Sequence, residues 1–119
     1  MKNNYLVYVY HILESLHAIS EFTINQNSDS LVKDKMRWDA VLRNLQTIAD
    51  STKFIPQNIK NKYTHIPWSD IVGFRNILVH EYLEGLDKDI VWQVITHDIL
   101  DLQKAMLDIC PNWKPLESI

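Results

Sequence analysis

The stretch GFRNILVHEYLEG, residues 73–85, lies between the only two glycines of the 119-residue chain, Gly73 and Gly85. Four prolines are the only other strong helix breakers. So few turn-forming residues argue against an all-β fold and favour a few long helices. A chain of this length is typical of a single domain, which buries roughly two-thirds of the surface of the unfolded chain. We therefore expect residues 1–119 to form a single all-α domain.

Apolar residues recur at spacings of three and four in four segments, about residues 3–23, 31–54, 67–82 and 88–109. This spacing predicts an amphipathic helix in each segment. Amphipathic helices with short connections are typical of an antiparallel bundle. We predict an antiparallel four-helix bundle with an additional short helical turn in QNIKNKYTHIP, residues 57–67.

Capping residues and helix breakers mark the ends of these helices. They are Asn27, Ser28 or Ser30 before the second helix, Pro56 after it, Pro67 at the start of the third, Gly85 as its left-handed cap and Pro111 after the fourth.

Aromatic residues add an expectation about assembly. Tyr5, Tyr8 and Tyr10 lie around more than one face of the first helix, which fits a helix buried on both sides by dimerisation. The tryptophans are interpreted most simply as core or interface anchors, with base stacking as the alternative. They are Trp38, Trp68, Trp92 and Trp113.

The net charge of −3 is unevenly distributed. Residues 31–62 carry seven basic and three acidic side chains, whereas residues 81–119 carry three basic and eight acidic ones. One face could therefore meet phosphates while another repels them. The alternative is that both segments are ordinary solvated helix surfaces.

Neither a membrane span nor a secretion signal is expected. The chain has no run of 18 apolar residues, and YLVYVYHILESL, residues 5–16, lacks a cleavage site. The single cysteine, Cys110, has no disulfide partner and no metal-ligand spacing, so we expect a half-buried intracellular thiol without a catalytic role. The predicted location is the cytoplasm.

Four polar side chains interrupt the apolar run at Arg75, Asn76, His80 and Tyr82. On a helix, Asn76 and His80 share a stripe with Gly73, and Arg75 and Tyr82 lie on a neighbouring stripe. The opposite side is expected to face the core. It consists of Ile71, Phe74, Ile77 and Leu78. One side of the helix would then be fixed while the other presents hydrogen-bond donors to a cleft.

Each polar group also has a purely structural interpretation. Arg75 can lie over Phe74 at the surface, Asn76 can bond to the backbone, and His80 can be partly buried. Tyr82 can end the helix with its hydroxyl in water. Gly73 destabilises a helix by up to ~1 kcal/mol relative to alanine, which suggests that another backbone or a bulky partner approaches there.

RNILVHEY, residues 75–82, has the form Arg-x4-His-x-Tyr with Asn directly after Arg. This resembles the signature of the HEPN superfamily, specifically of HepT-like toxins paired with minimal nucleotidyltransferase (MNT) antitoxins. Three longer segments resemble the second, third and fourth helices of that family. They are AVLRNLQTIADSTKFIP at 40–56, IPWSDIVGFRNILVHEYL at 66–83 and VWQVITHDILDLQKAM at 91–106.

The resemblance implies a metal-independent ribonuclease that acts as a homodimer, with the two motifs lining a shared cleft. Histidine can act as acid or base at neutral pH, which suits His80. Arg75 would bind phosphoryl oxygens through its planar fork of donors, and Asn76 would position the phosphate or orient the imidazole. The complementary proton-transfer group could come from the second subunit, from water, or be replaced by arginine stabilisation alone.

The resemblance also implies a regulator. In the family, the antitoxin transfers AMP from ATP to the motif tyrosine, here Tyr82, and silences the nuclease. An anion beside Arg75 would occupy the place of the substrate phosphate. The expected partners are therefore RNA (tRNA or mRNA), the MNT antitoxin and a second copy of the chain.

No cofactor is expected, and no metal site. The histidines show neither an HxxxH pair nor a carboxylate cluster; they are at positions 11, 17, 65, 80 and 97. Two other functions stay open. One is a non-enzymatic helical partner that binds or presents substrate for the nucleotidyltransferase, and the other is a structural bundle.

Overall fold

The computed structural model describes residues 4–81 and 85–115, and every regular element in these ranges is helical. The all-α prediction is confirmed. The elements are α1 (Tyr5–Phe22), α2 (Ser28–Lys33), α3 (Lys35–Thr52), α4 (Gln57–Lys60), α5 (Trp68–Glu81), α6 (Lys88–Gln93), the π-helical η1 (Val94–Asp98) and α7 (Ile99–Ile109).

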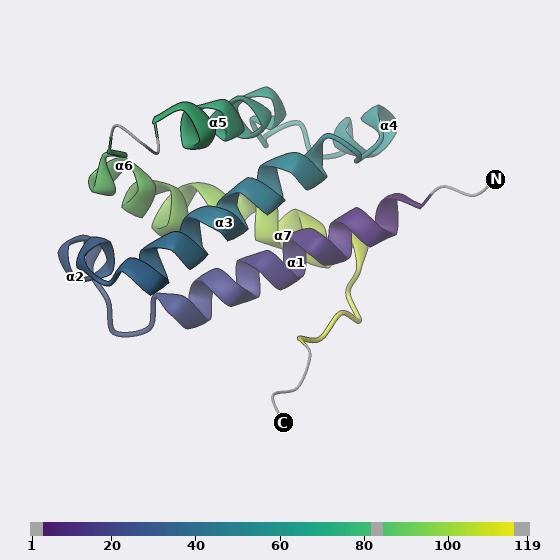
Figure 1. Cartoon of the computed structure of the whole chain (residues 1–119). Coiled ribbons are helices and arrows are strands. Elements are labelled where there is room, and N and C mark those ends of the chain that lie inside the picture. The colour runs from purple at the N-terminus through teal and green to yellow at the C-terminus, as the bar shows by residue number, and fades with distance from the viewer. Residues whose placement is uncertain (1–3, 82–84, 116–119) are drawn as a thin grey trace.

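The helix α3 contacts both α1 and α5 (Figure 1). It lies along α1 and runs in the opposite direction, and α5 runs back along it. The helix α7 packs against α1. The helix that carries the candidate motif is therefore held mainly by α3.

Most of the apolar residues that recur at spacings of three and four are buried, as the predicted amphipathic helices require. The residues buried as expected are Val9, Ile12, Leu13, Leu16 and Ile19 in α1, Val41, Leu42, Leu45, Ile48 and Ala49 in α3, and Val91, Ile95, Leu102 and Met106 in the last helical segment. The tryptophans at positions 38, 68, 92 and 113 are partly buried against this core, as anchors should be. Within the described ranges, none of the helices is both long and apolar enough to cross a bilayer.

The prediction of one continuous helix over 31–54 is wrong, because the chain breaks at Asp34. This residue is extended (φ −91°, ψ 95°), and its side chain accepts a hydrogen bond from the Arg37 backbone N–H at 3.2 Å. A short carboxylate offers the backbone this local alternative to a helix, so the apolar periodicity continues across a real helix start. The result is two helices, α2 and α3.

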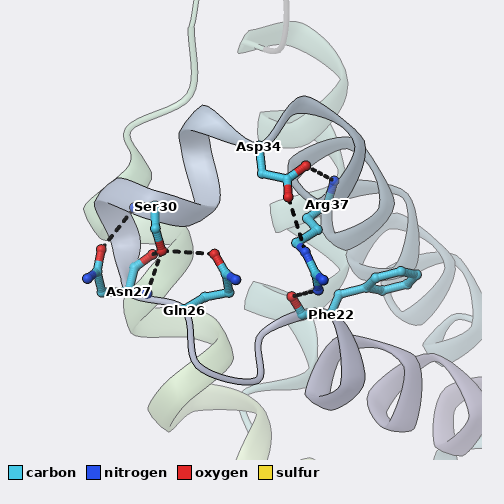
Figure 2. A network of polar contacts seen from close by, with 6 residues as sticks. All are labelled: Phe22, Gln26, Asn27, Ser30, Asp34 and Arg37. Atoms are coloured by element: carbon cyan, nitrogen blue, oxygen red, sulfur yellow. Dashed lines mark hydrogen bonds and ion pairs between the residues drawn. The ribbon is translucent and has the colours of Figure 1, made fainter.

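Of the three candidate caps Asn27, Ser28 and Ser30, the structure shows Asn27 as the N-cap. Asn27 Oδ1 accepts from the Ser30 N–H at 2.9 Å, and Ser30 Oγ accepts from the Asn27 N–H at 3.0 Å, which forms a capping box (Figure 2). Next to it, Arg37 joins three segments, with Nε 3.1 Å from Asp34 Oδ2 and Nη1 donating to the Phe22 carbonyl at 3.0 Å. The α1–α3 connection is therefore fixed by polar contacts.

The segment predicted as one helix over 88–109 contains the π-helical turn η1. Thr96 Oγ1 donates to the Trp92 carbonyl at 2.7 Å, a side-chain bond that competes with the backbone ladder just where the π turn lies. Gly85 has φ +92°, as expected of a left-handed cap, although residues 82–84 before it lie outside the described residues.

The loop that leads into α5 is fixed by Tyr63. Its hydroxyl donates to Asp108 Oδ2 on α7 at 2.6 Å, and its carbonyl accepts from Trp68 Nε1 at 3.2 Å. The hydrogen bond to Asp108, followed by desolvation, raises the pKa of Tyr63 to about 12. These contacts connect the first residue of α5 to α7.

Replacing Asp34 with alanine should lower the free energy of unfolding by about 1 kcal/mol, because the first turn of α3 loses its cap. Urea unfolding followed by circular dichroism measures this. Asp101→Ala removes an exposed α7 carboxylate and is the matched control. Equal effects of the two substitutions would contradict a capping role.

Tyr63→Phe should lower stability by about 1 kcal/mol at pH 7, since it removes the bond to Asp108. The folded-state pKa lies above that of an unfolded tyrosine, near 10, so this contribution is complete below pH 10 and is lost as the pH rises through about 12. Urea unfolding of both proteins at pH 7 and pH 11 should show a smaller difference at pH 11. A difference independent of pH would refute this linkage.

Candidate active site

Arg75 faces α3 and binds a carboxylate there. Its Nε donates to Asp50 Oδ1 at 2.9 Å, and Lys53 Nζ lies 3.9 Å from the same oxygen. Two cations therefore share one carboxylate, which leaves a local net charge of +1. The Arg75 and Asp50 side chains are 35% and 41% exposed, so the pair adds only about 0–1 kcal/mol to stability.

Asn76 and His80 point elsewhere. Both are exposed, and as i and i+4 neighbours they share a stripe of α5 with Gly73. No hydrogen bond or ion pair joins Arg75 to either residue, so one chain does not gather the three predicted catalytic groups. A shared cleft needs a second chain and stays a prediction.

The apolar side of α5 is narrower than predicted. Leu78 is buried, and Ile71 and Phe74 pack partly buried against the core, as expected. Ile77 is 43% exposed, so its assignment to the core is wrong. It lies three residues before His80 and four after Gly73, on the outward stripe.

Apart from its two chain neighbours and the backbone of its own helix, no described part of the chain comes within 4 Å of a Cβ built on Gly73. The close approach inferred from this glycine is therefore not made by any other described segment.

A groove of about 390 Å³ lies between α3 and α5. Its lining residues are Asp39, Leu42, Arg43, Gln46, Leu78 and Val79. Asp50 and Arg75 lie one turn beyond Gln46 and Val79 on their helices, so the ion pair adjoins one end of this groove. Arg43 is exposed, and it forms no ion pair with any residue that the structure describes.

Internal contacts occupy much of the basic segment 31–62. Arg37 is bound to Asp34, Lys35 Nζ lies 3.0 Å from Asp39, and Lys53 approaches Asp50. Lys60 lies 5.6 Å from the Trp68 ring centroid, where burial lowers the pKa of the lysine. Fewer cations are free to meet phosphates than the count of seven basic residues indicates.

Three further predictions concern Tyr82, Cys110 and a metal site. Tyr82 lies outside the described residues. Cys110 is buried rather than half-buried, and burial raises the pKa of its thiol, which disfavours the reactive thiolate. Within residues 4–81 and 85–115, no three His, Cys, Asp or Glu side chains form a group able to hold a metal ion.

Sequence reasoning did not single out Asp50 as a site residue. It is one of three acidic residues in the mainly basic segment 31–62, and its partner lies 25 residues further along the chain. Only the packing of α5 on α3 brings the two together.

Comparison with known proteins found one family, described as Ribonuclease HepT-like, which matches residues 12–109. A "Gamma-glutamylcyclotransferase and putative RNase" of Methanocaldococcus jannaschii is 35% identical over 92% of this chain, which spans 49% of that protein. A "Putative RNase" of the same organism is 32% identical over 88% of this chain and 95% of its own length. The "Probable ribonuclease HepT" of Thermococcus cleftensis is 32% identical over 87% and 93%.

No solved structure matched the chain. The chain spans about half of the first relative and nearly all of the other two. The family match covers most of the sequence, including the Arg-x4-His part of the motif on α5. The chain therefore belongs to the HepT-like ribonuclease family.

Proposed function

We propose that this chain is a metal-independent endoribonuclease, the toxin of a HepT/MNT toxin–antitoxin pair, and that it acts as a homodimer of HEPN-type four-helix bundles. The observation that carries the proposal is the family match across Arg75 and His80, combined with the geometry of Arg75. Among the described residues its guanidinium is held only through Nε, and its Nη groups form no hydrogen bond there.

A second copy on the outward face of α5 would complete the site. This face presents an apolar side chain, Ile77, beside His80 and next to a glycine with open space around it. Covering Ile77 removes apolar surface from water, and Gly73 permits close approach of another helix. A two-fold contact there would bring two copies of His80 towards each other, and Arg75 would lie at the edge of the same cleft.

The proposed RNA cleavage uses the donor groups of Arg75, Asn76 and His80. The ribose 2′-oxygen attacks the adjacent phosphorus, and its proton passes to a base. The P–O5′ bond breaks, and an acid protonates the leaving 5′-oxygen. The products are a 2′,3′-cyclic phosphate and a 5′-hydroxyl. His80 serves as one of the two proton-transfer groups, Arg75 stabilises the charge on the phosphorane, and Asn76 positions the phosphate.

The position of Tyr82 in the sequence supports control by the antitoxin. In the proposed reaction the Tyr82 hydroxyl attacks the α-phosphorus of ATP, pyrophosphate leaves, and AMP remains on the tyrosine oxygen. Tyr82 follows Arg75 by seven residues, so on a continuing helix the two share a stripe. The added phosphate would pair with the Arg75 guanidinium and block the substrate phosphate.

Purified protein should cleave tRNA or mRNA in the presence of EDTA and leave 2′,3′-cyclic phosphate ends. Arg75→Ala and His80→Ala should each lower the rate at least about a hundredfold, since each removes a transition-state donor or a proton-transfer group. Gel electrophoresis and end-group analysis measure this.

Lys104→Ala and His65→Ala remove exposed side chains of the same charge type outside the motif and are the matched controls. Intact RNA at high protein concentration would refute the nuclease and favour the non-enzymatic partner of the nucleotidyltransferase.

Reaction with the cognate nucleotidyltransferase and ATP should add AMP-sized mass to the chain and abolish RNA cleavage. Tandem mass spectrometry should locate the addition on Tyr82. Tyr82→Phe should remain unmodified and active, whereas Tyr10→Phe, which changes an exposed tyrosine of α1, should be modified normally. Modification at any other tyrosine would contradict the assignment.

A further inference from the structure

We propose that Asp50 is a positioning residue for Arg75: it holds the guanidinium through Nε so that both Nη groups face the RNA phosphate. This inference rests on the proposed ribonuclease function and adds a residue from α3 to it. The geometry that motivates it is the 2.9 Å hydrogen bond from Arg75 Nε to Asp50 Oδ1.

The molecule contains a second arginine for comparison. Arg37 is held at both ends of its guanidinium, with Nε 3.1 Å from Asp34 and Nη1 bonded to the Phe22 carbonyl (Figure 2). The Nε and Nη1 groups of Arg37 are therefore occupied by contacts within the fold. Among the described residues, Arg75 is anchored at Nε only, and its Nη groups donate no hydrogen bond there.

The choice of Nε has a chemical consequence. A guanidinium carries five N–H donors, of which one is on Nε and four are on the two Nη nitrogens. A carboxylate bound at Nε fixes the plane of the group and leaves the four Nη donors for phosphoryl oxygens. The orientation exists before substrate arrives, and preorganised donors are the ones that stabilise a developing charge best.

The charge of Asp50 opposes RNA binding while its geometry favours catalysis. A carboxylate beside the phosphate site repels the substrate, and Lys53, 3.9 Å from the same oxygen, partly offsets this. Removing the carboxylate should therefore leave RNA binding unchanged or tighter but make the phosphoryl transfer slower. A residue needed only for folding would not separate binding from turnover in this way.

The test uses full-length wild type, Asp50→Ala and Asp50→Asn, with Asp101→Ala as the control for loss of one negative charge on another helix. Turnover is measured on cleavable RNA. Affinity is measured by fluorescence anisotropy on the same RNA with every 2′-oxygen methylated, which lacks the nucleophile. The Arg75 Nε–H resonance in ¹⁵N NMR spectra reports the ion pair without any need for activity.

Asp50→Ala should lower kcat by about tenfold to a hundredfold, because the donor fork loses its fixed orientation. Its Kd for methylated RNA should be equal to that of wild type or lower, and its Nε–H resonance should shift and exchange faster with water. Asp50→Asn keeps an acceptor oxygen and should recover most of kcat. Asp101→Ala should leave kcat unchanged.

The inference fails if wild type cleaves RNA and Asp50→Ala cleaves it with the same kcat, or if kcat falls only in proportion to the folded fraction seen by circular dichroism. If wild type itself cleaves no RNA, the proposed function falls and Asp50 loses its role with it. RNA cleavage by the wild-type protein therefore distinguishes a failure of the Asp50 inference from a failure of the proposed function.

Discussion

The packing of α5 on α3 is the constraint on which the candidate site depends. Leu78 is buried in this contact, and Arg75 reaches Asp50 on the same side of the helix. Together an apolar contact and an ion pair set the rotation of α5 about its axis. Once that rotation is set, Asn76, Ile77 and His80 can only face outward.

This rotation explains why one chain holds only part of the motif. Arg75 belongs to the side that meets α3, whereas His80 belongs to the side that meets solvent, and no side-chain rotamer moves a residue around the helix. The outward side nevertheless contains Ile77 at 43% exposure, with Val79 at 42% on the flank. Under the proposed function, a second chain on this face would cover these apolar side chains and remove them from water.

Apolar periodicity in the sequence predicted the helices well, but it cannot identify contacts between side chains on different helices. The apolar positions of α1 and α3 follow directly from three-to-four spacing. The predicted continuous helix over 31–54 is interrupted at Asp34 because a single capping hydrogen bond starts a new helix there, although the apolar spacing continues. Asp50 was missed for a different reason, since spacing within one helix says nothing about a partner 25 residues away.

The distribution of charge argues that RNA would be recognised by a few short-range contacts rather than by a broad positive field. The chain has a net charge of −3, and the basic residues Arg37, Lys35 and Lys53 lie against carboxylates of their own chain. If the chain binds RNA as proposed, few counterions would be released, so its affinity for RNA should depend only weakly on salt. Discrimination would then rest on the donors held in place at α5. This is the reason that the orientation of a single arginine, set by a single carboxylate, can matter more here than the total charge.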